Sequence, residues 1–158
     1  MKTSAMLSVL AALLVSGSAW ADGGTSCATA QEIFPNSSYT GDTSTSTSFI
    51  GSFSGVPSPG PDLAFKFTSN GPTGPIAVTI TGGWNAGGVI TSSCAAIAGP
   101  PLQAGTGTTS FNVPMTGLTN GTVYYFIMTG NPSDNSGPSG PFNFVTSFPV
   151  TVQTFFVE

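Results

Sequence analysis

The chain alternates apolar and polar residues with a period of two through most of its length, and Gly, Pro and Asn interrupt the alternation at short intervals. Leu63, Phe65 and Phe67 fall on one side of an extended segment at residues 63–68, and residues 76–80 repeat the pattern. A period of two places successive side chains on opposite faces of a strand, so both segments predict half-buried β-strands.

Residues 123–129 are apolar on both parities, which predicts a central strand that is buried on both faces. The dipeptide Asn120-Gly121 precedes this strand and is a strong turn signal. Further short strands are expected at 49–53, 89–91, 109–115, 142–146 and 148–157. Together these segments make about seven to nine strands, which is typical of an all-β, antiparallel β-sandwich.

Three segments are expected to be loops. Residues 82–88 read GGWNAGG, and residues 130–141 are a long polar run rich in Gly, Pro, Asn and Ser. Residues 98–107 contain the paired prolines Pro100 and Pro101. Proline has no N–H to donate to a neighbouring strand, so we expect no regular strand in this third segment.

The first residues read as a secretory signal peptide spanning residues 1–21. Lys2 supplies the positive start, an apolar run follows at 6–15, and Ala19-Trp20-Ala21 matches the cleavage pattern of small residues. We expect cleavage before Asp22 and a single domain at 22–158, either secreted or periplasmic. No later apolar run approaches the roughly 18 residues of a membrane span, so no membrane insertion is expected.

Charged residues make up 5% of the sequence, against about 25% in typical proteins. Thr, Ser, Asn and Gln must therefore supply the polar surface. Lys66 is the only basic residue after the signal segment, and nucleic-acid binding needs several such groups, so we expect no nucleic-acid partner. Because Lys66 lies on the polar parity of its strand, we interpret it as a solvated surface group.

Cys27 and Cys94 are the only cysteines. In an exported chain they are expected to form one disulfide, which would stabilise the fold by roughly 4 kcal/mol in the chain-entropy model. A shared metal site is the alternative, but the sequence has no His and no further Cys to complete it.

Several segments follow one another along the chain in a recognisable order: SCATAQEI, YTGDTSTST, GPDLAFKFT, IAVTITGGWNAGGVIT, GLTNGTVYYFIMTG and SGPFNFVT. This order resembles the bacterial pre-peptidase C-terminal domain. That family carries a Cys-Ala opening, a Gly-Asp-Thr segment, an Asp before an aromatic strand, and a Gly-Thr-x-Tyr-Tyr strand. The resemblance implies a jelly-roll-like β-sandwich from an exported bacterial protein.

Relatives in that family usually follow secreted peptidases, bind polymers such as collagen, and in some cases bind calcium. This chain departs from the pattern in three ways. We expect no peptidase domain before the module, Asn85 stands where an Asp is common, and residues 147–158 extend beyond the match as a final strand or tail. Asp62 occupies the family position before the aromatic strand, where we expect it to hold a turn.

Catalytic chemistry has few candidates. The absence of His excludes Ser-His-Asp and Cys-His arrangements, and the carboxylates after the signal segment share no motif. Asp42, Asp134 and Asn135 lie in oxygen-rich loops that leave calcium as an alternative, although Asx-type turns explain them better. We expect no enzymatic activity and no cofactor.

Binding is the function class that the sequence favours. Trp84 lies in a Gly-rich loop beside Asn85, and sugars or proline-rich chains are commonly held by an aromatic ring with nearby amides. Trp84, Asn85 and Asp62 are therefore the candidate binding residues, although capping of the core explains Trp84 better. An extracellular polysaccharide or protein is the expected partner. The alternatives are a surface or matrix protein that associates through sheet edges, and, least favoured, a weak carboxylate hydrolase.

Overall fold

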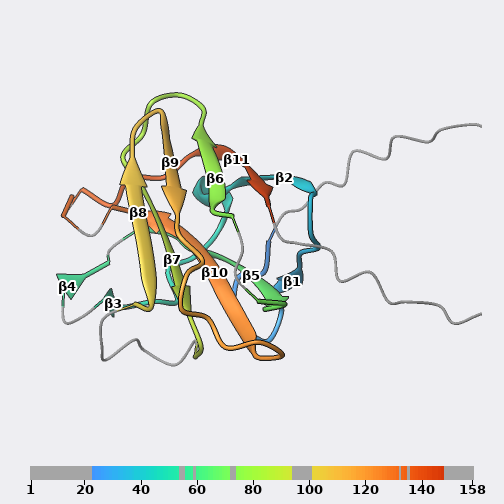
Figure 1. The fold of residues 1–158 in the computed structure, drawn as a ribbon. Coiled ribbons are helices and arrows are strands. Elements are labelled where there is room, and N and C mark those ends of the chain that lie inside the picture. Colours follow the sequence, from blue (N-terminus) through green and yellow to red (C-terminus); the bar gives the residue numbers. More distant parts are fainter. Residues whose placement is uncertain are drawn as a thin grey trace, which may run out of the picture.

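The computed structural model describes residues 23–53, 56–58, 60–71, 74–93, 101–131, 133–134 and 136–147. Two β-sheets pack face to face in this part of the chain (Figure 1). The five-stranded sheet has the order β1 (Gln31–Glu32), β5 (Leu63–Thr68), β10 (Val123–Gly130), β7 (Ala86–Thr91), β8 (Gln103–Gly107). The four-stranded sheet has the order β2 (Ser38–Asp42), β11 (Pro141–Thr146), β6 (Ile76–Ile80), β9 (Ser110–Val113).

Two short elements complete the described chain. The strands β3 (Ser52–Phe53) and β4 (Val56–Pro57) form a small hairpin, and a single 3-10 turn, η1, spans Thr43–Thr45. The described residues thus hold 11 strands, more than the sequence predicts. The strands without a counterpart in the sequence prediction are β1, β2, β4 and β8. β1 and β4 are two residues long and too short to produce an alternating pattern, and β2 contains a single large apolar residue, Tyr39.

Strand pairing is antiparallel throughout the two sheets except for β1, which runs parallel to β5. The register aligns Glu32 of β1 with Lys66 of β5, and the Ile33 N–H donates to the Lys66 carbonyl oxygen at 2.9 Å. The mostly antiparallel, two-sheet, all-β architecture agrees with the sequence prediction.

Phenylalanine rings form the centre of the core between the two sheets. Phe65 and Phe126 come from the five-stranded sheet and Phe142 and Phe144 from the four-stranded sheet, and all four are at most 1% exposed. The Phe65 and Phe144 ring centroids lie 4.9 Å apart in an edge-to-face arrangement, a geometry that aromatic pairs favour. The alternation predicted for 63–68 and 76–80 therefore places the expected residues inside.

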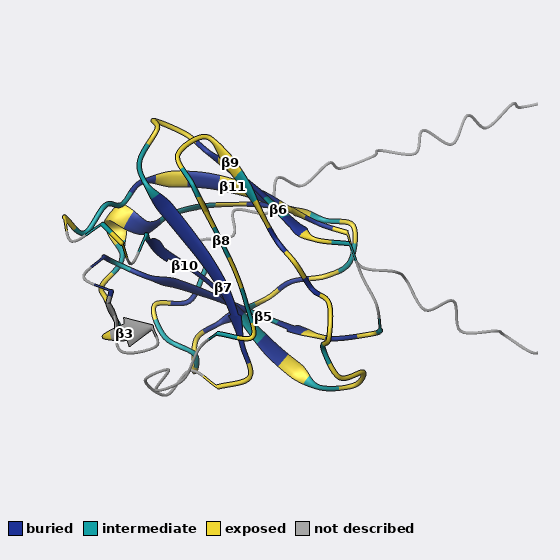
Figure 2. Cartoon of the chain, turned by 60° about the vertical axis from the view of Figure 1, so that its left-hand side comes forward, coloured by how far each residue is buried: buried dark blue, intermediate teal, exposed yellow. Residues whose placement is uncertain are grey.

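The three central strands of the five-stranded sheet, β5, β10 and β7, are largely buried on both faces, which explains the two-sided pattern of β10 (Figure 2). Phe126 faces the main core, whereas Ile127 faces a second cluster with Ala64, Val89 and Ile50. Ile50 lies between β2 and β5 in the chain, in a segment that packs against the outer face of this sheet. The sequence prediction that the Ala64 parity faces solvent is therefore wrong at Ala64, which is 0% exposed.

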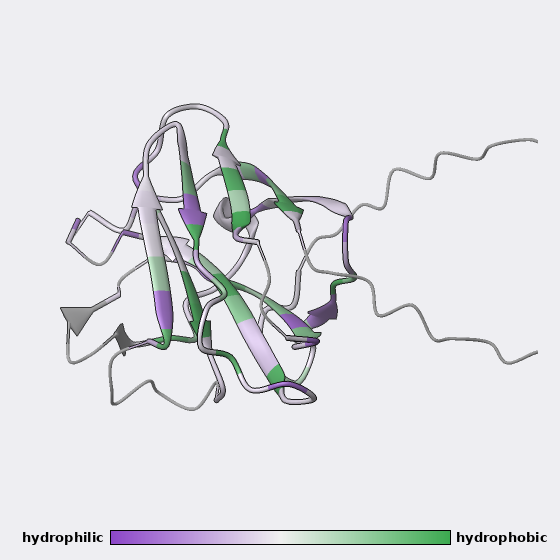
Figure 3. Cartoon of the chain, in the orientation of Figure 1, coloured by the Kyte–Doolittle hydropathy of each residue, from purple (hydrophilic) through white to green (hydrophobic). Residues whose placement is uncertain are grey.

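Two of the segments predicted as loops contain strands. Residues 86–88 of the GGWNAGG segment begin β7, and residues 103–107 form β8, which shows little hydrophobic colour (Figure 3). A Cβ on Gly88 would lie 2.9 Å from Phe111 Cε2, so the missing side chain lets the rings close over the strand. Glycine leaves no alternation to detect, and Pro101 precedes β8 rather than interrupting it.

Several predictions lie outside the described residues. The signal peptide at 1–21, the cleavage site before Asp22, Cys94, Asn135 and the final strand or tail after Ser147 belong to this group. Cys27 is described and is not a free thiol. Its pairing with Cys94 stays a prediction.

Candidate functional site

Trp84 lies in the connection that crosses from β6 of one sheet to β7 of the other. Its indole is half-buried and packs against the main core cluster, and its Nε1 donates to the Pro141 carbonyl oxygen at 3.0 Å. A Cβ on Gly140 would lie 2.6 Å from Trp84 Cδ1, so the ring is seated directly on the Gly140 backbone. Trp84 thus caps one end of the core while keeping part of its surface accessible.

Asn85 is the centre of a hydrogen-bond network beside that ring. Its Nδ2 donates to Asp134 Oδ2 at 3.2 Å, and its Oδ1 accepts from Asn131 Nδ2 at 3.0 Å. The Asn131 backbone N–H donates to the Asn85 carbonyl oxygen at 3.0 Å. These bonds fix the 130–141 loop to the start of β7, so the structure brings three sequence candidates, Trp84, Asn85 and Asp134, to the same end of the fold.

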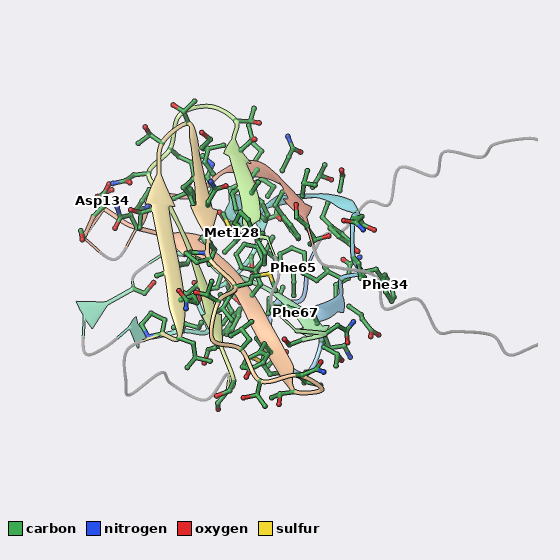
Figure 4. All side chains as sticks on the ribbon, viewed as in Figure 1. Phe34, Phe65, Phe67, Met128 and Asp134 are labelled. Carbon is green, nitrogen blue, oxygen red and sulfur yellow. The ribbon has the colours of Figure 1, made fainter. Side chains whose placement is uncertain are left out.

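Asp134 is held mainly by its own turn. Its Oδ1 accepts from the Ser136 N–H at 3.1 Å and from the Ser136 hydroxyl at 2.6 Å. These bonds, with a smaller contribution from Asn85, lower the pKa of the Asp134 carboxyl below its ordinary value. The residue lies on the outside of the molecule, far from Phe34 (Figure 4). This is the Asx-type turn that the sequence favours over a calcium ligand.

Asp42 makes the same kind of turn at the end of β2. Its Oδ1 accepts from the Ser44 N–H at 2.9 Å and the Ser44 hydroxyl at 2.6 Å, and so caps η1. Asp42 is also the register partner of Pro141, whose carbonyl oxygen accepts the Trp84 Nε1 proton. Asp42 therefore belongs to the same end of the fold as Trp84.

Asp62 occupies a different place from the other candidates. It is 0% exposed, and its Oδ2 accepts from the N–H groups of Phe49 and Ile50, both at 2.8 Å. These bonds hold a turn of the segment that covers the outer face of the five-stranded sheet, as the sequence predicts. Because the carboxyl is fully buried, Asp62 cannot contact a polymer on the surface, and its assignment to a binding site with Trp84 is not supported by this geometry.

The environment of Asp62 is polar but contains no cation among the described residues. Its Oδ1 is buried and accepts no hydrogen bond of normal geometry. The Thr129 hydroxyl, which is hydrogen-bonded with Ser58 Oγ at 3.0 Å, lies close enough to the carboxyl group to influence its pKa. Burial raises the pKa of the Asp62 carboxyl above its ordinary value, and the bonds from Thr129, Ile50 and Phe49 only partly oppose that rise.

Lys66 is half-buried rather than freely solvated, between Glu32 of β1 and Tyr125 of β10 in the register of the sheet.

The described residues contain no group of three or more His, Cys, Asp or Glu side chains that could hold a metal ion. They also contain no helix that is long and apolar enough to cross a membrane.

The sequence does not predict the contact that joins the turn after β2 to the 130–141 loop at this end of the fold. The Thr43 N–H donates to the Gly140 carbonyl oxygen at 3.1 Å, and the Gly140 N–H donates to Thr43 Oγ1 at 3.0 Å. Thr43 is 0% exposed although it lies in the polar run 41–48. A threonine in a Thr- and Ser-rich run gives no signal of its own, so only the fold reveals its role.

Comparisons of this chain with protein-family models, with curated proteins and with solved structures gave no match.

Proposed function

We propose that this protein is an exported, non-enzymatic β-sandwich module, jelly-roll-like and similar to the pre-peptidase C-terminal domain, that binds a neutral extracellular polymer. The observation that carries the proposal is the partly accessible Trp84 indole, seated on Gly140 and flanked by the Asn85–Asn131 amide pair. An aromatic ring that is rigid before binding loses little conformational entropy when a ligand stacks on it.

The chemistry of this end of the fold suits a ligand without charge. Amide groups donate to and accept from hydroxyl groups, and an indole offers an apolar surface for stacking against a sugar ring or a proline. Asp134 and Asp42 are the nearby acids, and each is engaged by a serine of its own turn. A hydroxyl-rich polysaccharide or a proline-rich chain therefore fits better than a polyanion or a polycation.

The placement of the acids supports a non-enzymatic role. Asp42 and Asp134 have one carboxylate oxygen occupied by backbone and hydroxyl donors of the same turn. Asp62 is buried and holds two backbone N–H groups. A carboxylate hydrolase needs an accessible pair of acids at about 5 to 9.5 Å, with one of them free to exchange a proton.

Retention on insoluble polymers tests the proposal. The mature chain should be retained on at least one neutral polysaccharide or on collagen. Trp84→Phe keeps an aromatic ring but loses the Nε1 donor, and Trp84→Ala loses both, so retention should fall in that order. Leu102→Ala is a matched control, because Leu102 is a 50% exposed apolar residue next to β8.

Melting curves of each variant would separate loss of binding from loss of folding. Failure of the wild-type chain to bind every polymer would contradict the proposal. Equal losses in Trp84→Ala and Leu102→Ala would contradict the assignment of binding to the Trp84 end.

A further inference from the structure

The strand β2 is an open edge of the four-stranded sheet. It pairs with β11 on one side, and no described strand pairs with its other side. At the opposite edge of that sheet, β9 follows β8 directly and packs closely against it, because a Cβ on Gly105 would collide with the Asn112 carbonyl oxygen. The edge strand β1 of the other sheet has only two residues. The edge strand β8 has five residues, as β2 does, but it lies against β9, so β2 is the longest edge in the described part of the chain that no other strand covers.

The backbone groups on that edge can be assigned from the pairing with β11. The Thr43 N–H donates to the Gly140 carbonyl oxygen, and the Thr146 N–H donates to the Ser37 carbonyl oxygen. In an antiparallel pair the hydrogen-bonded positions alternate, so the odd-numbered residues of β2 bond to β11. The N–H and C=O groups of Ser38, Thr40 and Asp42 consequently point away from the sheet.

Few of the features that usually protect an edge strand are present. The five residues Ser38–Asp42 include no proline and no lysine, and Asp42 at the end is the only charged side chain. Ser38 and Thr40 are exposed, and both side chains lie on the outer face of the sheet. An edge with unpaired backbone groups and small uncharged side chains can accept another strand without moving a charge from water.

We propose that a second copy of this chain pairs with β2, antiparallel and about a two-fold axis through Thr40. The two four-stranded sheets then form one continuous sheet. Thr40 faces Thr40 of the other copy, and Ser38 faces Asp42, so the Ser38 hydroxyl can donate to that carboxylate. A two-fold interface of this type is self-complementary, which is the usual arrangement in soluble dimers.

The charges of this arrangement are compatible with pairing. Each Asp42 lies two residues from the axis, on opposite sides, so the two carboxylates are separated by about 13 Å along the strands. That distance exceeds the Debye length of roughly 10 Å at 0.1 M ionic strength, so their repulsion is largely screened. Any other register that keeps these outward-facing backbone groups paired changes the distance between the two Asp42 carboxylates or leaves part of β2 unpaired.

A cysteine placed at the axis tests the proposal. Directly opposed residues of a hydrogen-bonded antiparallel pair have Cα atoms about 5.5 Å apart, within the range of a disulfide. Under mild oxidation, or with a short bismaleimide, the mature Thr40→Cys chain should form covalent dimers. Thr79→Cys is the matched control, because Thr79 is an exposed threonine on the same face but in β6, which has neighbours on both sides.

Light scattering over a range of concentrations provides the second readout. The wild-type mature chain should show a dimer mass at high concentration. Thr40→Lys places two like charges opposite one another at the axis and should weaken the dimer by more than about tenfold. Thr79→Lys adds the same charge to the same face away from the edge and should leave the dimer unchanged.

Three results would overturn the proposal. The wild-type chain could remain a monomer up to millimolar concentration, Thr40→Cys could cross-link no more than Thr79→Cys, or Thr40→Lys could leave a dimer intact. Removal of residues 148–158 adds a further arm: a chain that dimerises only after this truncation would assign the edge to the C-terminal segment instead of a second copy. Polymer retention by a strictly monomeric chain would leave the proposed binding function standing.

Discussion

The Trp84 indole donates its Nε1 proton to the carbonyl oxygen of Pro141 at 3.0 Å. Trp84 lies in the connection between β6 and β7, and Pro141 begins β11. The same carbonyl oxygen accepts from the Thr81 N–H at 3.1 Å. One acceptor therefore holds both the backbone and the side chain of the crossing segment, and it fixes the orientation of the ring that we assign to binding.

Trp84→Ala should lower the free energy of unfolding by about 2 to 4 kcal/mol, because it removes a partly buried ring from the end of the core. Trp84→Phe should cost less, since it retains most of the apolar contact and loses the hydrogen bond to Pro141. Chemical denaturation of the mature chain measures both. Equal stability of wild type and Trp84→Ala would show that the ring does not cap the core.

Gly140→Ala tests the seating of the ring. A Cβ at this position would lie 2.6 Å from Trp84 Cδ1 and 2.8 Å from Nε1, so either the indole or the backbone must move. We expect a loss of about 1 to 3 kcal/mol and a shift in Trp84 fluorescence. Gly51→Ala is the control, because a Cβ there meets nothing within 4 Å. The same effect from both substitutions would contradict the contact.

Asp62 should make stability depend on pH. The pKa of Asp62 is raised in the folded state, so the folded chain keeps its proton to a higher pH than the unfolded chain does. Its contribution is fully present below the unfolded pKa of about 4 and is lost as the pH rises through the folded pKa. The effect of Asp134 on stability is opposite, because its pKa is lowered in the folded state. Its stabilising contribution is present above about pH 4 and is lost as the pH falls below that value.

Asp62→Asn should therefore remove the loss of stability above about pH 4 and leave the chain at least as stable at pH 7. Its side-chain oxygen can still accept from Phe49 and Ile50. Asp62→Ala leaves both buried N–H groups without an acceptor and should cost about 2 to 4 kcal/mol. Unfolding free energies of the three chains from pH 3 to 8 measure this. An unchanged pH profile in Asp62→Asn would contradict the assignment.

Asn85→Asp should weaken the network at the Trp84 end. The new carboxylate replaces the amide that donates to Asp134 Oδ2, so two acidic side chains face each other. Either the two negative charges repel each other or one carboxyl group keeps its proton, and both outcomes remove the hydrogen bond of the wild-type chain. We expect the free energy of unfolding to fall by roughly 1 kcal/mol at neutral pH. Binding of calcium between the two carboxylates would reverse this loss. Melting temperatures with calcium and with a chelator measure it, and Asn85→Ser serves as the uncharged control.

The pairing of Cys27 with Cys94 predicts that the mature chain has no reactive thiol. Mass spectrometry after alkylation without reduction should find neither cysteine modified, and reduction should expose both. A substantial fraction of alkylated Cys27 in unreduced protein would rule the disulfide out.

Alternation predicted the strands that carry one buried and one open face, such as β6 with Ile76, Val78 and Ile80 inside. It failed where glycine replaced side chains, in β7 and β8, since a residue without a Cβ contributes nothing to the pattern. It also failed at Ala64, because the segment containing Ile50 returns to cover a face that looks exposed in the local sequence.

The candidate site was predicted only in part. Trp84 and Asn85 are adjacent in sequence, so their joint placement needs no knowledge of the fold. Asp134 joins Asn85 through contacts 49 residues apart, which no local pattern reveals. Asp62 was expected to hold a turn and was also a binding candidate with Trp84 and Asn85, and only the return of Phe49 and Ile50 over it explains its burial.

Trp84 fluorescence in the mature chain tests the central claim most directly, because cleavage before Asp22 would remove the only other tryptophan, Trp20. Titration with soluble fragments of neutral polysaccharides and with collagen peptides should shift or quench the emission in a saturable way for at least one of them. An unchanged emission with every ligand, from a folded chain that those polymers do not retain, would contradict the assignment of this protein as a binding module.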